Sequence, residues 1–468
     1  MECNLNNSIY ITPWLSWHEY ILSGYINTLI FEQHSHSYYL LSDEAAEAWR
    51  ELCAGRVIAN LLHHLQPLIN DGVISLNYEI ENKLISTDEM RHIKTTKHQT
   101  IPDYFNKELR KEGYIFDAHW DITNKCNAKC IHCYNPNAHS GLRNIDIDEL
   151  SFEEAKKLVD ELIYLGVFRL VLSGGEVLTK SYFLPLCKYI RKHNIQLIIY
   201  TNGIAFTEEM QCNLASLHPS TICFSVYGDN DCSHDNITRV KGSYQKTLNA
   251  LSYFSNHHID TCHKNTILSE NFTCWKETLK KGNTLASKSL LNCTIYPSLD
   301  NRRLSEYCVN ESQLVELAMS PDSPIYYKRR IVGACNIHKS NDYTPCYNET
   351  NTIYITPKGE ICLCIAFPFV IASLRDGNIR TLKRNRRNKK FINELSMLKG
   401  TDLLDNWRSL KISNLKECGT YDYCEYCIDV CPGDAYMLTG DLLKAPENHC
   451  LIAKARHKVF LLNNTEQK

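Results

Sequence analysis

The sequence lacks the features that would direct a chain to a membrane, to secretion or to nucleic acid. Its 51 basic and 53 acidic residues leave a formal net charge of −2, which predicts no strongly polyanionic partner. The longest apolar run, residues 361–372, contains Pro368 and falls short of the roughly 20 residues that a membrane helix needs. No basic segment followed by an apolar stretch opens the chain, so no signal peptide is predicted. We therefore expect a cytoplasmic protein with no membrane and no nucleic-acid partner.

Cysteine, by contrast, is abundant. The chain has 468 residues, enough for about three domains, and 22 of them are cysteines. Three cysteines gather near residue 130 and nine lie between Cys335 and Cys450, whereas the other ten are scattered, several of them in apolar segments. In a large intracellular chain, clustered cysteines more often bind metals than form disulfides. The two clusters are therefore candidate metal sites, and the scattered thiols are assigned no function.

Strand and helix patterns alternate from about residue 115 to residue 320. The clearest helix begins at a capping box formed by Ser151 and Glu154, places apolar residues on one face and ends at Gly166. Strand-like runs precede or follow such helices at residues 115–123, 168–172, 196–201, 221–226, 259–268 and 291–297. Six units of this kind predict an α/β fold with a parallel sheet and crossover helices.

Three cysteines follow the first predicted strand in the spacing C-x3-C-x2-C. They are Cys126, Cys130 and Cys133, and an aromatic residue, Tyr134, comes directly after the third. Three thiolates can ligate three irons of a four-iron cluster and leave the fourth iron without a protein ligand. An open coordination position is typical of a catalytic metal site rather than a closed structural one. A zinc knuckle and three unrelated reduced cysteines are the alternatives.

The segment Ser173-Gly174-Gly175-Glu176 follows directly after the second predicted strand. Its two glycines allow close approach of the backbone to a ligand. The carboxylate beside them can accept a hydrogen bond from an ammonium group. In βα barrels the active site lies at the C-terminal ends of the strands, so this segment and the three cysteines are expected at one site.

Together these segments resemble the signature of the radical S-adenosylmethionine (radical SAM) enzymes. The resemblance implies a partial (βα)6 barrel over residues 113–320, in which the three cysteines hold a [4Fe–4S] cluster and its open iron chelates S-adenosylmethionine. Glu176 would hold the amino group of the cofactor. Further cofactor contacts are implied for Tyr134, Ser173, Gly174, Gly175, Asn202, Ser225 and Arg239. One-electron reduction of the cluster would cleave the sulfonium and leave a 5′-deoxyadenosyl radical, which can take hydrogen from an unactivated C–H bond.

The C-terminal cysteines resemble a second family pattern, the loop-rich SPASM iron–sulfur domain, over residues 330–468. The resemblance implies two auxiliary [4Fe–4S] clusters. The ligands of the first would be Cys335, Cys346, Cys364 and Cys431, with Cys362 as a spare. The ligands of the second would be Cys418, Cys424, Cys427 and Cys450. Tyr421 stands where the family pattern has a cysteine, and Cys424 is expected to substitute for it. One or more zinc sites are the alternative.

Residues 1–95 are expected to form a separate, winged-helix-like unit. Strand-like pieces at residues 20–22, 29–31 and 38–40 precede a helix that begins at Ser42, a second helix over 57–69 and a returning strand. Residues 38–49 resemble the leader-recognition element of peptide-modifying systems, which captures an extended leader peptide as an added strand. A generic N-terminal cap and a DNA-binding relic are the alternatives, and the lack of basic charge disfavours the second. The hydrophilic residues 80–112 are predicted to be a linker.

These resemblances imply a radical SAM enzyme that matures a ribosomally synthesised precursor peptide. Hydrogen abstraction from a substrate residue would be followed by a thioether or carbon–carbon cross-link, with an auxiliary cluster taking up the second electron. A reductant such as flavodoxin or ferredoxin would be the electron donor. One alternative is a maturase of a whole protein or of a cofactor precursor, as in the sulfatase-activating and quinone-cofactor relatives. The other is a redox-sensing iron–sulfur regulator that binds peptides.

Overall fold

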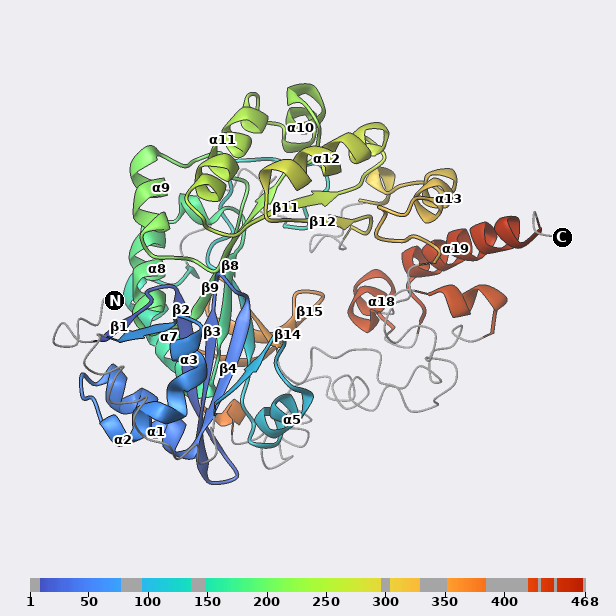
Figure 1. Ribbon diagram of the computed structural model, residues 1–468. Coiled ribbons are helices and arrows are strands. Elements are labelled where there is room, and N and C mark those ends of the chain that lie inside the picture. The colour runs from blue at the N-terminus through green and yellow to red at the C-terminus, as the bar shows by residue number, and fades with distance from the viewer. Residues whose placement is uncertain are drawn as a thin grey trace.

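The expected α/β fold is confirmed in the computed structural model. Its centre is a nine-stranded sheet in the order β12-β11-β10-β9-β8-β7-β13-β14-β15 (Figure 1). The structure describes residues 9–76, 95–135, 148–295, 304–328, 352–383, 420–427, 431–441 and 444–465. No helix in these ranges is both long enough and apolar enough to cross a membrane.

Six strands of the sheet form the partial barrel, and every neighbouring pair among them is parallel. The strands are β7 Asp117–Asp121, β8 Arg169–Ser173, β9 Gln196–Thr201, β10 Thr221–Ser225, β11 Thr261–Thr266 and β12 Lys288–Asn292. The helices that connect and cover them are α7 Phe152–Leu165, α8 Phe183–Lys192, α9 Glu208–Ala215, α10 Asp231–Thr238, α11 Ser243–Asn256 and α12 Trp275–Leu285. The capping box of Ser151 and Glu154 is present at the start of α7, and Gly166 ends that helix with a positive φ of 84°.

The two faces of the barrel strands differ in polarity because side chains alternate along a strand. On β7, Ala118 and Trp120 belong to the main hydrophobic core beneath the helices. The intervening His119 and Asp121 lie on the opposite face, inside the barrel. The same alternation on the neighbouring strands leaves a polar interior, and the candidate site lies there.

A C-terminal hairpin extends the barrel sheet beyond β7. β13 Thr352–Ile355 pairs in parallel with β7, and β14 Glu360–Cys364 and β15 Phe367–Ser373 follow as antiparallel neighbours. Helix α13 Glu311–Met319 packs against α19 Glu447–Thr465, with α18 Pro432–Thr439 nearby (Figure 1). The buried guanidinium of Arg456 donates to the carbonyls of Tyr326, Tyr327 and Tyr426, which ties α19 to both neighbouring segments.

The N-terminal unit is a four-stranded antiparallel sheet with short helices on one face. Its strands, in the order β2-β3-β4-β6, are β2 Leu15–Leu22, β3 Tyr25–Glu32, β4 Ser37–Ser42 and β6 Thr95–His98; β1 Ile9–Ile11 pairs separately with β5 Ile74–Leu76. Helices α1 Asp43–Cys53, α2 Ala59–Leu62 and α3 Gln66–Asn70 contribute to the core on one face. The other face packs against α5 Asp103–Lys111 and against Phe116 and Phe168 of the barrel domain. The unit is therefore docked on the barrel.

Two predictions about this region are corrected by the structure. The linker predicted over residues 80–112 contains the strand β6 and the helix α5; residues 80–94 lie outside the described ranges. The polar composition hid α5, whose two buried residues, Phe105 and Leu109, lie one helical turn apart. The single helix predicted over residues 57–69 is divided into α2, a short 3-10 turn and α3. The division places Pro67 in the first turn of α3, because proline is tolerated in the first turn of a helix but not in its interior.

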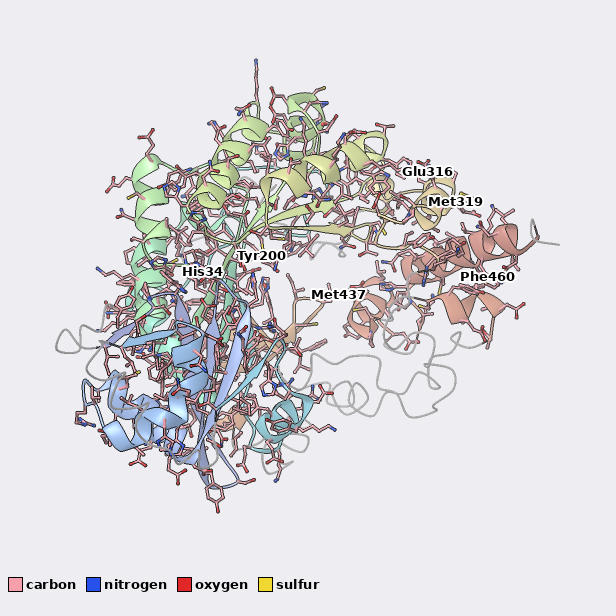
Figure 2. All side chains as sticks on the ribbon, in the orientation of Figure 1. His34, Tyr200, Glu316, Met319, Met437 and Phe460 are labelled. Carbon is pink, nitrogen blue, oxygen red and sulfur yellow. The ribbon has the colours of Figure 1, made fainter. Side chains whose placement is uncertain are left out.

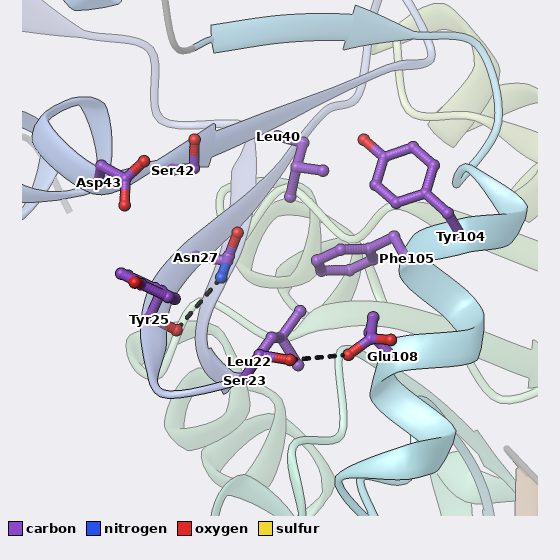
Figure 3. A pocket seen from close by; sticks show the side chains of 10 residues that line it. All are labelled: Leu22, Ser23, Tyr25, Asn27, Leu40, Ser42, Asp43, Tyr104, Phe105 and Glu108. Carbon is purple, nitrogen blue, oxygen red and sulfur yellow. Dashed lines mark hydrogen bonds between the residues drawn. The ribbon is translucent and has the colours of Figure 1, made fainter.

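Figure 3 shows how α5 meets the edge of the N-terminal sheet. Phe105 lies beside Leu22 and Leu40, and the hydroxyl of Ser23 donates to Glu108 at 3.1 Å. An open groove of about 480 Å³ remains between the β2–β3 turn, the end of β4 and α5. Tyr25 and Tyr104 stand at this groove and are 67% and 57% exposed.

Candidate active site

The loop that carries Cys126, Cys130 and Cys133 follows β7 and is fixed by backbone hydrogen bonds. The amide of Cys133 donates to the carbonyl of Cys130 at 3.1 Å. Two further amides of the loop, those of Lys129 and Ile131, donate to carbonyls at the end of α10 at 3.0 and 3.1 Å. The cysteine loop is therefore held between β7 and α10.

Gly174 and Gly175 are required because the cysteine loop passes directly over them. The amide of Gly175 donates to Thr123 at 2.7 Å, and the amide of Glu176 donates to Lys125 at 2.9 Å. A Cβ atom on Gly174 would lie 2.2 Å from the carbonyl oxygen of Thr123, and one on Gly175 would lie 2.3 Å from that of Lys125. The close approach expected at these glycines is thus made by the loop's own backbone.

Glu176 is fully enclosed and its carboxylate accepts three hydrogen bonds. The Thr201 hydroxyl and the Asn202 amide donate to its two oxygens at 2.6 and 2.7 Å, and the Leu178 amide donates at 3.1 Å. Burial raises the pKa of Glu176 to about 7, although these hydrogen bonds act in the opposite direction. The site therefore holds a carboxylate that an incoming ammonium group would keep charged.

The remaining residues expected to contact the cofactor are not equally close to the site. Ser173 and Ser225 line the same cavity as the cysteines. The side-chain amide of Asn202 donates to the side-chain oxygen of Asn127 in the cysteine loop at 2.7 Å, so this side chain also positions the loop. Arg239 ends α10 with a positive φ of 59°, is exposed, and does not line the cavity.

One cavity of about 470 Å³ collects the three cysteines and the predicted cofactor residues other than Arg239 at the C-terminal ends of the barrel strands. It is bounded by the cysteine loop and residues 173–176 on one side and by the β13–β14 hairpin on another, through Tyr354 and Cys364. Its volume lies within the range of small-molecule sites. Tyr134 also lines it, and its hydroxyl lies 3.4 Å from the carboxylate of Asp121.

Sequence reasoning missed the polar groups on the barrel strands inside this cavity. Lys264 on β11 places its Nζ atom 3.9 Å from the ring centroid of Tyr200 on β9 (Figure 2 labels Tyr200), and burial lowers the pKa of Lys264. His119 and Cys223 also line the cavity. For His119 the signal was the alternation of polar and apolar residues along β7, which indicates an interior face, whereas β11 has no such alternation.

The residues present fit a four-iron cluster. Burial raises the pKa of Cys126 to about 12 and also raises the pKa of Cys130 above its ordinary value. An iron cluster would therefore have to displace their protons, as metal binding to thiols requires. Among the described residues, no three potential ligands converge on a single metal ion. Cys126, Cys130 and Cys133 all line the same cavity, as the three protein ligands of one cluster must.

The C-terminal cysteines occupy two regions of the structure. Cys364 lines the cavity, whereas Cys362 is fully buried in β14 and does not line it. Cys431 caps α18, which packs on β15 next to the strand that carries Cys364. Cys424 and Cys427 lie in and after the 3-10 helix η8 Asp422–Tyr426, which packs on α19, the helix of Cys450. Cys335, Cys346 and Cys418 lie outside the described ranges.

Comparison with known proteins identifies the superfamily. Residues 120–281 match the family model of the Radical SAM superfamily. AdoMet-dependent heme synthase of Methanosarcina barkeri is 22% identical over 354 residues, which are 71% of this chain and 95% of that protein. Mycofactocin maturase MftC of Mycolicibacterium smegmatis is 34% identical over 137 residues, 29% of this chain but only 33% of that protein.

Solved structures share the fold. Streptococcus suis SuiB bound to S-adenosylmethionine has a TM-score of 0.50 at 13% identity, covering 90% of this chain and 98% of that chain. SuiB bound to the precursor peptide SuiA has a TM-score of 0.51 at 12% identity, covering 94% and 99%. Residues 120–281 thus form a radical SAM domain, and this chain is a radical SAM enzyme that uses a [4Fe–4S] cluster and S-adenosylmethionine.

Replacing Glu176 with glutamine is expected to weaken S-adenosylmethionine binding at least about tenfold, because the amide cannot offer a charged acceptor to the ammonium group. In the unaltered enzyme the affinity should fall several-fold between about pH 7.5 and about pH 6, as the carboxylate with a pKa near 7 takes up a proton. The variant should not show this dependence. Titration calorimetry measures both effects, and Glu209→Gln, an exposed carboxylate on α9, is the control. Identical pH profiles for the two enzymes would contradict this role of Glu176.

Proposed function

We propose that this enzyme modifies a ribosomally synthesised precursor peptide. The observation that carries the proposal is the N-terminal unit, a small antiparallel sheet with three short helices that is docked on a radical SAM barrel. Such a sheet offers an edge to which an extended peptide can add as a strand. The similarity to mycofactocin maturase and the fold shared with SuiB, which was solved with its precursor peptide, support the same substrate class.

In this proposal the residues of the cavity bind the cluster and the cofactor and orient the reacting residue of the peptide. Cys126, Cys130 and Cys133 hold the cluster, and Glu176 accepts the ammonium group of S-adenosylmethionine. When bound, the cluster and the cofactor would supply the one-electron chemistry that removes hydrogen from an unactivated C–H bond. The reacting residue of the peptide enters beside Tyr200 and Lys264, which line the same cavity as Glu176.

The product we propose is an intramolecular thioether or carbon–carbon link. Forming either link removes two hydrogen atoms from the peptide, so a second electron must leave the substrate. The ligands proposed for two auxiliary clusters in residues 330–468 include Cys364, which lies in the wall of the cavity and is therefore placed to receive that electron. Flavodoxin or ferredoxin is the proposed external reductant. Residues 1–95, extended by β6, are the proposed leader-binding domain.

The proposal is tested with a candidate precursor peptide taken from short open reading frames sought beside the gene. Anaerobic incubation of this peptide with reduced holoenzyme and S-adenosylmethionine should give a product lighter by two hydrogen atoms, and fragmentation by tandem mass spectrometry should not separate the linked residues. Glu176→Gln enzyme is the control. An unchanged peptide, under conditions in which the cofactor is cleaved, would contradict peptide maturation.

A second candidate is favoured by one of the sequence relatives. The heme synthase matches over nearly its full length, which points to a tetrapyrrole precursor instead of a peptide. Lys264 offers the cavity an amine that could pair with a substrate carboxylate. The remaining 29% of this chain lies outside that match. This argues against heme synthase activity, because an enzyme with that activity would not need the additional residues. Heme formation, followed by its visible absorption, distinguishes the two candidates.

A further inference from the structure

The fourth strand of the N-terminal sheet follows the helices of the unit in the sequence instead of preceding them. β6 pairs antiparallel with β4, with Thr95 opposite Leu41 and His98 opposite Tyr38. It is attached to the helical side of the unit by two contacts. The Thr95 hydroxyl donates to the carbonyl of His64 at 2.7 Å, and Lys97 pairs with Asp71, the residue that ends α3, at 2.9 Å. β6 therefore occupies the edge of β4 beside α3.

The opposite edge of the sheet is already used by the barrel domain. Along β2, the carbonyl of Leu15 accepts from Arg191 at 2.9 Å, and the amide of Trp17 donates to the carbonyl of Asn194 at 3.0 Å. The amide of Ile21 donates to the hydroxyl of Tyr114 at 3.1 Å. An added strand cannot displace these contacts without separating the unit from the barrel. The side of the sheet formed by β4 and its edge strand β6 is thus the side available to a peptide.

β6 is weakly held compared with the rest of the sheet. It has four residues, of which only Thr95 is buried, whereas β2 and β3 pair over eight positions each. No residue of β6 is apolar, and the ion pair of Lys97 is partly exposed, which adds little stability. Replacing β6 with another strand would therefore break few interactions.

The groove of Figure 3 lies where such a strand would begin. In a replacing strand, one residue takes the place of Thr95 opposite Leu41. The residue before it would lie opposite Ser42, with its side chain on the same face of the sheet as Leu40. Ser42 and Leu40 line the groove together with Phe105 and the exposed Tyr104. An apolar side chain at that position would find a binding pocket. This chain has Lys94 in the corresponding place in its sequence.

We propose that β6 is a resident strand on the peptide-docking edge of β4, and that the precursor peptide binds by replacing it. The identity of the peptide rests on the proposed function, whereas the strand exchange does not. The replacing segment would carry an apolar residue for the groove, then a small β-branched residue in the place of Thr95. A basic residue two positions later would face Asp71. The apolar residue is what gives the peptide its advantage over β6.

The test uses the full-length holoenzyme and a fluorescein-labelled peptide with the sequence of residues 92–101, with binding followed by fluorescence anisotropy. Lys97→Glu in the protein weakens β6 at Asp71 and should tighten probe binding about fivefold over wild type. The control Lys246→Glu, at an exposed lysine of α11, should bind the probe as wild type does. An unchanged rate of S-adenosylmethionine cleavage verifies that both variants are folded.

A second probe tests the groove. A peptide carrying Lys94→Phe should bind about tenfold tighter than the first, because its aromatic side chain leaves water. Tyr104→Ala in the protein should reduce that gain. Equal affinities of wild type and Lys97→Glu enzyme, or equal binding of a scrambled peptide, would overturn the proposal. No precursor peptide enters this assay, so its failure would leave peptide maturation standing, and a failed maturation assay would leave strand exchange standing.

Discussion

Replacing Cys126, Cys130 and Cys133 with alanine should abolish formation of 5′-deoxyadenosine from S-adenosylmethionine under reducing, anaerobic conditions. The three thiols lie on one backbone-fixed loop that lines the cavity shared with Glu176. Without them no protein ligand holds the cluster, and no side chain in the cavity can perform one-electron cleavage of the cofactor. Chromatography of the reaction mixture measures the product directly.

The matched control changes cysteines that lie on the surface. Cys212 and Cys232 are exposed and lie outside the cavity, so their double replacement with alanine should leave deoxyadenosine formation at the wild-type rate. The iron content of the triple variant should fall by about four, the content of one cluster. Cofactor cleavage by the triple variant at the wild-type rate would show that the radical SAM chemistry has been assigned to the wrong residues.

Replacing Cys424 with alanine should remove about four of an expected total of about twelve irons, which corresponds to three clusters of four. Cys424 is buried in η8, where Tyr421 and not cysteine occupies the position of the family pattern. The phenol of Tyr421 is a poor substitute, because four-iron clusters are held by cysteine thiolates. Iron analysis of the reconstituted protein measures the loss. Because metal binding and folding are coupled, unfolding of the C-terminal domain is the other form that this loss can take.

Two further variants test whether Cys424 is an iron ligand or only a buried packing residue. Tyr421→Phe should keep the full iron content, because Tyr421 is 53% exposed and stacks on Tyr423 instead of facing Cys424. Cys424→Ser preserves the size of the side chain and should still lose the irons. A full iron content in Cys424→Ser would mean that Cys424 is only a packed thiol. Cys362, which is buried in β14, would then be reconsidered.

The candidate site was predictable where its residues are neighbours in sequence. The spacing of Cys126, Cys130 and Cys133 and the segment ending in Glu176 follow two adjacent strands, and parallel strands bring their C-terminal ends together. The role of Gly174 was only half predictable, because its close neighbour is the carbonyl of Thr123 and not a ligand. Lys264 was not predictable, since nearly every residue of β11 is polar and the strand shows no alternation that would reveal which side chains face across the barrel.

The sequence by itself determined the α/β alternation and the iron-binding loop, because both depend on periodicity and spacing over a few residues. Only the tertiary structure decided that β13 pairs with β7 and that β6 pairs with β4. Both pairings join segments that are distant in the chain, and a short strand pairs according to the edge that the folded protein offers it, not according to its own propensity. For β6 this edge overrode a polar composition typical of a linker. The same edge is where we infer that the peptide binds.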